Sequence, residues 1–328
     1  MRAIVAKKLG PPEDLVIEEI NSLQPGPGQV VVDNRAAAIN FPDLLVMEGK
    51  YQVRPPLPFS PGKEGAGVIK EVGAGVDRLK VGDRVMVQVE YGTYAQEVLA
   101  DESQCYPVPE DVSFEEAAAI GIAYQTAHFA LVARAHLNHG HKVLVTGASG
   151  SVGLAAMQLA KAWDCEVIAG LTTMSKESLV RENGADHVID VSGAEVRDTI
   201  RDDIREITGG GVDIVIEIVG GEVFDGSVRA LNFGGSLVVV GFTGGTIPTF
   251  KVNYALLKNI AVTGVNWAEY RDRDPEWVQR VQAELFDMVA DGKIHVPVQA
   301  VYPMDQVVDA CQIIIDRKIQ GKVVISMG

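Results

Sequence analysis

The stretch that decides the fold runs Lys142-Val143-Leu144-Val145-Thr146-Gly147-Ala148-Ser149-Gly150-Ser151-Val152-Gly153-Leu154. Apolar residues dominate its start, as expected for a strand that is covered on both faces of a parallel sheet. A glycine-rich turn follows, and an amphipathic helical pattern begins directly after the turn. A buried strand, a glycine-rich turn and a helix in this order predict a site for the phosphates of a dinucleotide.

The small residues of this stretch follow the spacing Ala148-x-Gly150-x-x-Gly153, with alanine at the first of three glycine positions. Gly150 would let the backbone approach a pyrophosphate, and Gly153 would let the helix pack close to its strand. The helix N-terminus would offer N–H groups and a partial positive charge to the phosphates. An ordinary strand–helix turn is the alternative, because a lone glycine pattern is weak. The residues expected to bind the cofactor here are Ser149, Gly150, Ser151, Val152 and Gly153.

After the glycine-rich stretch, the chain alternates between buried strands and helices, with glycine turns between them. Helical patterns lie around residues 152–163 and 175–183. The predicted strands are residues 142–146, 166–171, 187–191, 212–219, 236–242 and 260–267. This alternation predicts a doubly wound parallel α/β sheet, the Rossmann arrangement.

The rest of the chain shows a different pattern of secondary structure. The first 110 residues contain short strands between proline and glycine turns, which favours an irregular antiparallel barrel or sandwich. Two helices are predicted after Ser113, the second over residues 124–135. The C-terminal part predicts helices over 275–291 and 307–315 and a closing strand over 322–325 that could return to the first sheet. We therefore expect one domain of residues 1–122 and 268–328, wrapped around a nucleotide domain of residues 123–267.

The end of the second predicted nucleotide strand indicates the cofactor. Sites for NAD usually carry Asp or Glu about 20 residues after the glycine turn, where it binds the ribose hydroxyls. Here the strand ends Leu171-Thr172-Thr173, without a carboxylate to repel a 2′-phosphate. Thr172 and Thr173 offer hydroxyl groups and Lys176 offers a positive charge, so the pattern favours NADPH. The alternative for Lys176 is a solvated residue at a helix start.

Composition excludes several classes of protein. The 328 residues are 47% hydrophobic and 22% charged, which is typical of a globular chain and not of a disordered one. With 29 basic and 44 acidic residues the net charge is −15, so we expect no nucleic-acid partner. The longest uncharged stretch, residues 230–250, is broken by glycines and a proline, so no membrane segment is expected. Three separate cysteines and a start without a signal peptide favour a reduced, cytoplasmic protein.

Further motifs occur along nearly the whole chain. They are Asn40-Phe41-Pro42-Asp43, Pro61-Gly62-Lys63-Glu64-Gly65-Ala66-Gly67, Gly73-x-Gly75-Val76, Val81-Gly82-Asp83-Arg84-Val85, Gly92-Thr93-Tyr94-Ala95, Gly184-Ala185-Asp186 and Gly321-Lys322-Val323-Val324. With the glycine turn at 147–153 they resemble the zinc-independent quinone oxidoreductase family of the medium-chain dehydrogenase/reductase superfamily. The resemblance implies a GroES-like irregular β-barrel catalytic domain beside the Rossmann NADPH-binding domain.

The resemblance to this superfamily also argues against a metal site. Zinc-dependent alcohol dehydrogenases of this superfamily bind zinc through a Cys and a His, and here those places fall at or next to Asn40 and at Lys63. A cationic lysine is a poor zinc ligand. The remaining metal candidate is His136-x-x-His139-x-His141, which lacks a carboxylate or thiol in register and suits a surface turn. We therefore expect no metal site.

Without a Lewis acid, alcohol oxidation is hard to run, whereas reduction of an electron-poor acceptor needs only a hydride and hydrogen-bond donors. The resemblance thus implies hydride transfer from NADPH to a quinone or an α,β-unsaturated carbonyl. The candidate catalytic residues are Asn40, Tyr51, Lys63 and Tyr94. Further cofactor contacts are expected from Thr126, which resembles the residue that touches the nicotinamide, and from Gly241, Phe242, Asn266 and Trp267 at strand ends.

Each catalytic candidate, and the cofactor candidate Trp267, could instead have a purely structural role. Tyr51 and Tyr94 could be solvated rim residues, Asn40 could hold a turn before Pro42, and Trp267 could belong to the core. Lys63 could pair with Glu64 or another carboxylate of its loop.

Two other functions stay open. One is an enoyl-thioester reductase acting on an acrylyl-CoA-like substrate, which needs a basic patch for the coenzyme A phosphates; Arg54, Arg271 and Arg273 could supply it. The other is a non-catalytic NADPH-binding or RNA-binding crystallin-like protein, against which the charge of −15 argues in the case of RNA.

The strand at residues 260–265 is expected to be the last of its sheet, because no further strand–helix unit follows it. A bare apolar edge strand is a pairing hazard. The resemblance implies that this edge pairs with its own copy across a two-fold axis, so we expect a homodimer.

Overall fold

The computed structural model describes residues 1–328 and divides into two compact units. The first comprises Met1–Ile122, Arg273–Asp287 and Val296–Gly328, and the second comprises Ala123–Asp272 and Met288–His295. Two segments that we expected in the first domain, 268–272 and 288–295, thus belong to the second unit.

Contacts inside the second unit explain this difference. The ring of Tyr270 stacks on that of Phe129, with 4.3 Å between ring centroids. The His295 N–H donates to Oε1 of Gln158 at 2.8 Å, and the Tyr124 hydroxyl donates to the His295 carbonyl oxygen. These contacts hold both segments on the helices of the nucleotide domain.

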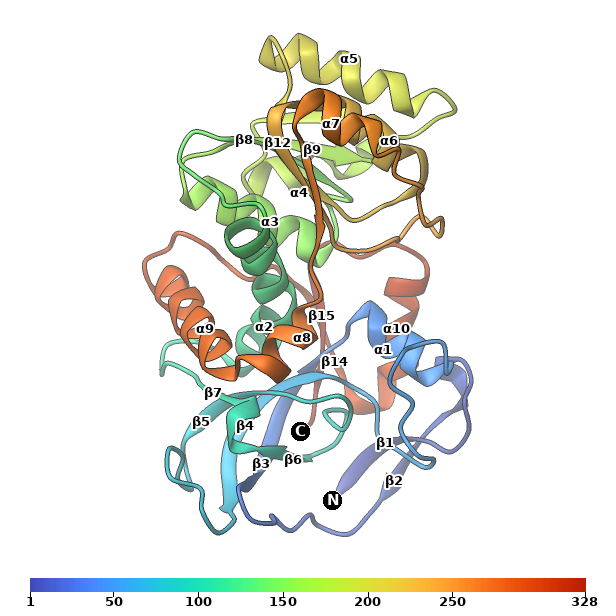
Figure 1. Ribbon diagram of the computed structural model, residues 1–328. Helices are drawn as coiled ribbons and strands as arrows, with labels where there is room; N and C mark the ends of the chain where they lie inside the picture. Colours follow the sequence, from blue (N-terminus) through green and yellow to red (C-terminus); the bar gives the residue numbers. More distant parts are fainter. The chain divides into compact units, whose positions relative to one another are not determined.

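The second unit contains a six-stranded parallel sheet in the order β10-β9-β8-β11-β12-β13 (Figure 1). This is the order of a doubly wound nucleotide-binding sheet and confirms the predicted fold class. The bounds are β8 Lys142–Thr146, β9 Glu166–Leu171, β10 His187–Asp190, β11 Val212–Glu217, β12 Leu231–Val239 and β13 Ala261–Gly264. β13 is the edge strand, as predicted, while β12 begins five residues earlier than expected.

Helices connect and cover these strands. They are the end of α2 Phe114–His128, from Ala123 onward, and α3 Ser151–Ala162, α4 Glu177–Glu182, α5 Val196–Thr208, α6 Gly221–Ala230, α7 Asn253–Lys258 and α8 Trp267–Arg273. The separate helix expected at 124–135 does not exist, because α2 continues directly into a π-helix over Phe129–Arg134. Between the sheet and α5 and α6 lies an apolar core that includes Ile200, Ile204 and Phe224.

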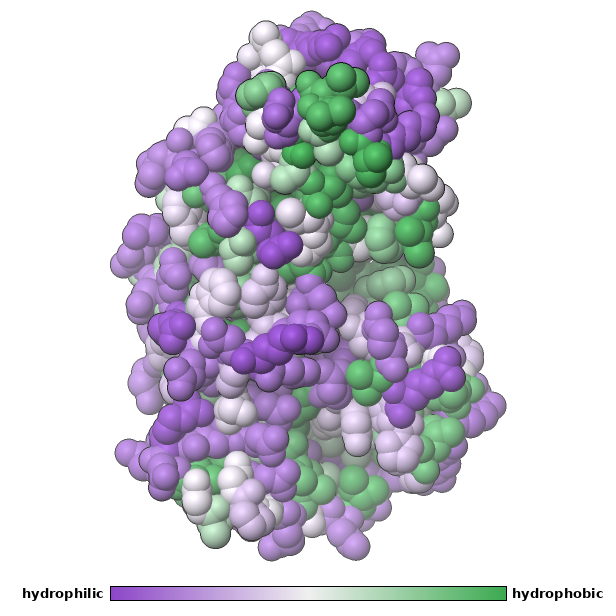
Figure 2. Space-filling view, viewed as in Figure 1, coloured by the Kyte–Doolittle hydropathy of each residue, from purple (hydrophilic) through white to green (hydrophobic).

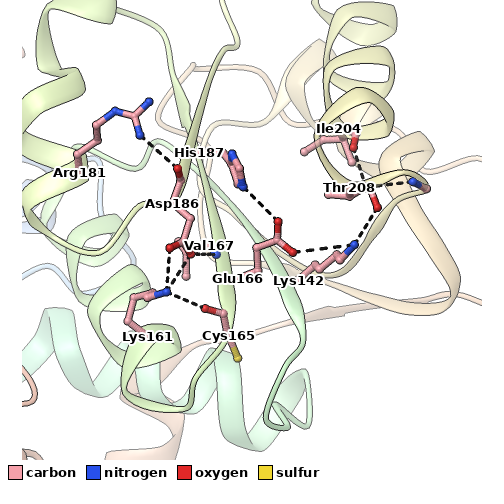
Figure 3. A network of polar contacts seen from close by, with 11 residues as sticks. Lys142, Lys161, Cys165, Glu166, Val167, Arg181, Asp186, His187, Ile204 and Thr208 are labelled. Carbon is pink, nitrogen blue, oxygen red and sulfur yellow. Dashed lines mark hydrogen bonds and ion pairs between the residues drawn. The ribbon is translucent and has the colours of Figure 1, made fainter.

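Polar contacts tie together the N-terminal ends of β8, β9 and β10 (Figure 3). Oε1 of Glu166 lies 3.2 Å from Nε2 of His187, and its Oε2 lies 3.9 Å from Nζ of Lys142. Lys161 of α3 bonds both carboxylate oxygens of Asp186 at 2.9 Å. The strand starts are therefore fixed by side chains, and it is the opposite, C-terminal ends of the strands at which sheets of this kind bind ligands.

The first unit is a barrel-like arrangement of a seven-stranded and a two-stranded sheet. The larger sheet has the order β14-β15-β3-β4-β5-β7, with β6 also paired to β3. The strands are β1 Arg2–Ala6, β2 Leu15–Glu19, β3 Gln29–Ala38, β4 Glu64–Val72, β5 Arg84–Gln88, β6 Glu97–Asp101, β7 Cys105–Pro107, β14 Val298–Pro303 and β15 Lys322–Ser326. β15 pairs antiparallel with β3, so the C-terminal strand does return to the first sheet as predicted.

Three α-helices accompany these sheets: α1 Phe41–Met47, α9 Pro275–Ala290 and α10 Val307–Ile315. The core between α1, α10 and the sheet contains Tyr94, Cys311 and Val323. All three cysteines of the chain are buried and unpaired. No helix combines the length and the apolar character that crossing a membrane would require.

Candidate active site

The glycine-rich turn of the second unit brings helix α3 into close contact with the end of β8. Gly147 adopts a left-handed φ of +62°, and the Gly150 N–H donates to the Gly147 carbonyl oxygen at 3.1 Å. Helix α3 then begins at Ser151. A Cβ at Gly153 would come within 2.6 Å of the Gly147 carbonyl oxygen and 2.7 Å of Ala148, so the helix packs directly on the turn. Only glycine allows this approach, as the spacing of small residues predicts.

The other predicted cofactor residues lie at the C-terminal ends of the strands, which share one edge because the strands are parallel. Thr172 and Thr173 are exposed directly after β9. Lys176 is half-buried just before α4, and burial lowers the pKa of its ammonium. No carboxylate stands at the end of β9.

The remaining candidates of the second unit differ in exposure. Phe242 and Asn266 are exposed beyond the ends of β12 and β13, and Gly241 is half-buried beside Phe242. Thr126 is buried in α2. Trp267 is also buried, with the Arg271 guanidinium 5.4 Å from its ring centroid, so its indole belongs largely to the core.

Glu217 is a residue of this edge that the sequence analysis missed. It is fully buried at the end of β11, where Oε1 accepts hydrogen bonds from the Val219 and Gly220 N–H groups at 2.9 and 2.8 Å. The Thr146 hydroxyl contacts the same oxygen at 3.1 Å. Burial raises the pKa of the Glu217 carboxyl, and these hydrogen bonds oppose the rise. The sequence feature that could have pointed to Glu217 is a lone carboxylate inside an apolar strand. In the structure the Glu217 side chain joins the ends of β8 and β11.

In the first unit, Asn40 precedes α1 and its backbone N–H donates to Oδ2 of Asp43 at 2.8 Å. The Tyr94 hydroxyl donates to the same oxygen at 3.0 Å. Burial raises the pKa of Asp43 to about 6, against the opposing effects of the Asn40 N–H and the Lys63 charge. Tyr94 is completely buried, and Gly62 packs so closely on its ring that a Cβ there would lie 2.2 Å from it. The Tyr94 hydroxyl therefore faces Asp43 and not solvent.

Lys63 and Tyr51 are brought together in a second group of side chains. Nζ of Lys63 donates to Oε2 of Glu90 at 2.6 Å and lies 4.8 Å from the centroid of the Tyr51 ring. The Lys63 side chain is only 7% exposed, so its charge is largely desolvated. Lys63 thus pairs with a carboxylate, but its partner is Glu90 and not Glu64. Glu90 was not among the candidate residues.

Glu64 has a different partner, Lys322 at the start of β15. Oε1 of Glu64 accepts from Nζ of Lys322 at 2.6 Å and from Nδ2 of Asn40 at 2.9 Å. Nζ of Lys322 also donates to Oδ1 of Asn40 at 2.7 Å, which closes a triangle of hydrogen bonds. Oε2 of Glu64 accepts from the Ile122 N–H at 2.7 Å. Lys322 and Glu64 are almost fully buried, at 1% and 0% exposure.

Comparison with known proteins agrees with both units. Residues 26–110 match the family model described as alcohol dehydrogenase GroES-like domain, and residues 151–283 match the one described as zinc-binding dehydrogenase. A GroES-like unit joined to a Rossmann sheet with a dinucleotide turn defines a medium-chain dehydrogenase/reductase.

Individual relatives show which family of this superfamily the chain belongs to. The rat protein named quinone oxidoreductase-like protein 2 is 36% identical over 99% of this chain and 92% of its own length. A mycobacterial quinone oxidoreductase structure has a TM-score of 0.91 at 32% identity, over 99% of each chain. The Escherichia coli quinone oxidoreductase structure, complexed with NADPH, has a TM-score of 0.89 at 30% identity and covers 99% of this chain and 100% of that one. The chain belongs to the quinone oxidoreductase family, and family members bind a nicotinamide cofactor.

The name of the second family model raises the question of zinc. The described residues contain no group of three His, Cys, Asp or Glu side chains placed to hold a metal. The three histidines near residue 140 lie at a surface turn, where His139 is 3.5 Å from Asp164 and Nδ1 of His141 accepts from the Asn138 N–H. In the first unit, Glu64 is already paired with an ammonium, and Lys63 and Asn40 are not zinc ligands of ordinary type. The residues present do not fit zinc.

Proposed function

We propose that this protein is an NADPH-dependent, zinc-independent reductase that transfers a hydride to a quinone or an α,β-unsaturated carbonyl compound. The observation that carries the proposal is the donor set of the first unit. An amide and a buried ammonium group, those of Asn40 and Lys63, stand at or next to the places expected for zinc ligands, and the buried Lys322 ammonium donates to the amide oxygen of Asn40. Such donors suit a reaction in which negative charge develops on an oxygen atom of the acceptor.

The proposed roles follow from the hydrogen bonds of each side chain. Bound NADPH supplies the hydride. One Nδ2 hydrogen of Asn40 is held by Glu64, while the other has only a 3.5 Å contact to the Ala38 carbonyl oxygen, so it can donate to the acceptor oxygen. Lys63 adds positive charge beside Tyr51, whose hydroxyl is the proposed proton source. Tyr94 holds Asp43 and the start of α1 in place, which makes it a positioning residue in this proposal.

The test of this function is a screen of NADPH oxidation with quinones, enones and enoyl-CoA esters. We expect turnover with quinones or enones. Turnover with enoyl-CoA esters alone would favour the thioester reductase, although Arg271 is unsuited to bind coenzyme A because it is buried against Trp267 and Asp272. No turnover with any acceptor would favour a protein that only binds NADPH.

The preference for NADPH gives a prediction for Lys176. Replacing Lys176 by alanine removes the charge next to Thr172 and Thr173, so the dissociation constant for NADPH should rise roughly 10-fold or more. That for NADH should stay within about twofold. Fluorescence titration with both cofactors measures this, and Lys293→Ala, an exposed lysine of the same unit, is the control. Equal affinities of the native protein for NADPH and NADH would refute the preference.

We further propose a homodimer that forms through the open edge of β13. Support comes from apolar side chains that are 71–78% exposed in β12, in the loop after it and in α7, the segments that precede β13 in the chain: Phe233, Ile247, Val252, Leu256 and Leu257. Figure 2 shows hydrophobic atoms gathered over α7, the helix that precedes β13. A second copy of the chain would cover this surface and satisfy the unpaired backbone groups of the edge. We also propose a cytoplasmic location, which the buried, unpaired cysteines support.

A further inference from the structure

The triangle of Asn40, Glu64 and Lys322 joins the last strand of the chain to two residues from its first part. Lys322 lies 258 residues after Glu64 and 282 residues after Asn40 in the chain. An ammonium group only donates hydrogen bonds and a carboxylate only accepts them. The Asn40 amide must therefore turn its oxygen to Lys322 and its nitrogen to Glu64, as it does. The orientation of this amide is fixed by chemistry and not only by packing.

We infer that Lys322 is a built-in cation that positions and polarises the Asn40 amide. A hydrogen bond from an ammonium to the amide oxygen draws electron density away from the nitrogen and strengthens its N–H groups as donors. In a buried site this effect is larger than in water. The loosely held Nδ2 hydrogen of Asn40 is thus a stronger donor to an acceptor oxygen. In this inference Lys322 acts through the Asn40 amide, to which its ammonium donates, so it is a positioning residue.

This inference accounts for the mismatch with the zinc-binding name of the family model. Glu64 and Asp43 are the buried carboxylates around Asn40, and both oxygens of Glu64 already have partners in Lys322, Asn40 and the Ile122 N–H. A metal ion would have to displace the ammonium from a contact of 2.6 Å. The positive charge beside Glu64 therefore comes from a side chain of the protein, Lys322 of β15, and not from a bound metal ion.

The experiment compares Lys322→Met, Glu64→Gln and the double variant. Lys322→Met leaves the Glu64 carboxylate buried without a cation, so the melting temperature should fall on the order of 10 °C. Turnover with a quinone or enone acceptor should fall about tenfold or more, while KM for NADPH stays within about twofold. The double variant is neutral and of similar shape, so it should recover most of the melting temperature but not the turnover. Lys293→Met, an exposed lysine, is the control for loss of a charge.

The outcomes separate the parts of the inference. Recovery of turnover together with stability in the double variant would show that Lys322 only holds the fold. Additive losses of melting temperature in the two single variants would show that Lys322 and Glu64 do not act as a pair. Calorimetry with ZnCl₂ should detect no stoichiometric binding to the native protein, and binding that Glu64→Gln abolishes would overturn the built-in cation.

The effect on turnover rests on the proposed function, but the melting temperatures and the zinc titration do not. A native protein without acceptor-dependent turnover would refute the proposed function and, with it, the polarising role of Lys322. The stability pattern would still decide whether Lys322 and Glu64 form the ion pair.

Discussion

Replacing Gly153 by alanine is expected to weaken NADPH binding about tenfold or more and to destabilise the second unit. The added Cβ would lie 2.6 Å from the Gly147 carbonyl oxygen and 2.7 Å from Ala148, and both neighbours are backbone atoms that cannot swing aside. Helix α3 must therefore move away from the turn. Overpacking of this kind costs about 1–3 kcal/mol. The same movement withdraws the helix N-terminus from the cofactor phosphates.

Two matched glycines make this prediction specific. A Cβ at Gly150 would lie 3.4 Å from the Gly147 carbonyl oxygen, an ordinary contact, so Gly150→Ala should keep its stability and weaken NADPH binding alone. Gly210→Ala, with 3.6 Å to Asn232, should change neither property. Calorimetric unfolding and NADPH titration measure both effects. Native affinity in Gly153→Ala would show that the turn does not bind the phosphates.

The parallel sheet could be predicted from the sequence because buried parallel strands appear as local apolar runs. The bounds of β8 and β9 coincide with the prediction. β12 does not, because Asn232, Gly234 and Gly235 have the composition of a turn and yet lie within the strand. Leu231 pairs with Val212 before a shift of register, so pairing with a distant strand overrides the local pattern.

The buried polar groups of the first unit show why the site was only partly predictable. Asn40 and Lys63 belong to motifs that the sequence shows and were proposed as candidates on that ground, but their hydrogen-bond partners could not be predicted. Lys63 and Glu64 are adjacent, and neighbours in an extended chain point to opposite sides. Lys63 therefore meets Glu90, while Glu64 meets Lys322. No local pattern in the sequence announces a contact across 258 residues.

The proposed dimer leads to the second large effect, on assembly. Val262→Pro is expected to shift the protein toward monomers without unfolding the sheet. The Val265 N–H donates to the Val239 carbonyl oxygen of the neighbouring β12. Alternate residues of a strand point their N–H groups to the same side, so Thr263 also faces β12, while Val262 faces the open edge. Proline at an outward-facing edge position removes no hydrogen bond of its own sheet.

A two-fold axis doubles the consequence of this substitution. In an antiparallel pairing of β13 with its copy, each subunit contributes the Val262 N–H, so one substitution removes two hydrogen bonds. At about 0.5–1.5 kcal/mol each, and with the added bulk of two proline rings, the dissociation constant of the dimer should rise at least roughly 10-fold. Thr263→Pro is the matched comparison, because it removes a donor that faces β12 and should lower the melting temperature instead.

Sedimentation velocity at micromolar concentration measures the expected change from dimer to monomer, with NADPH titration to show that Val262→Pro keeps its nucleotide site. The nucleotide turn and the edge lie on different strands, β8 and β13, with β11 and β12 between them in the sheet. Cofactor binding and assembly should therefore respond independently. A native protein that sediments as a monomer would refute the dimer. A dimer that withstands Val262→Pro would place the contact on another surface, because two-fold pairing through β13 needs the outward N–H of that residue.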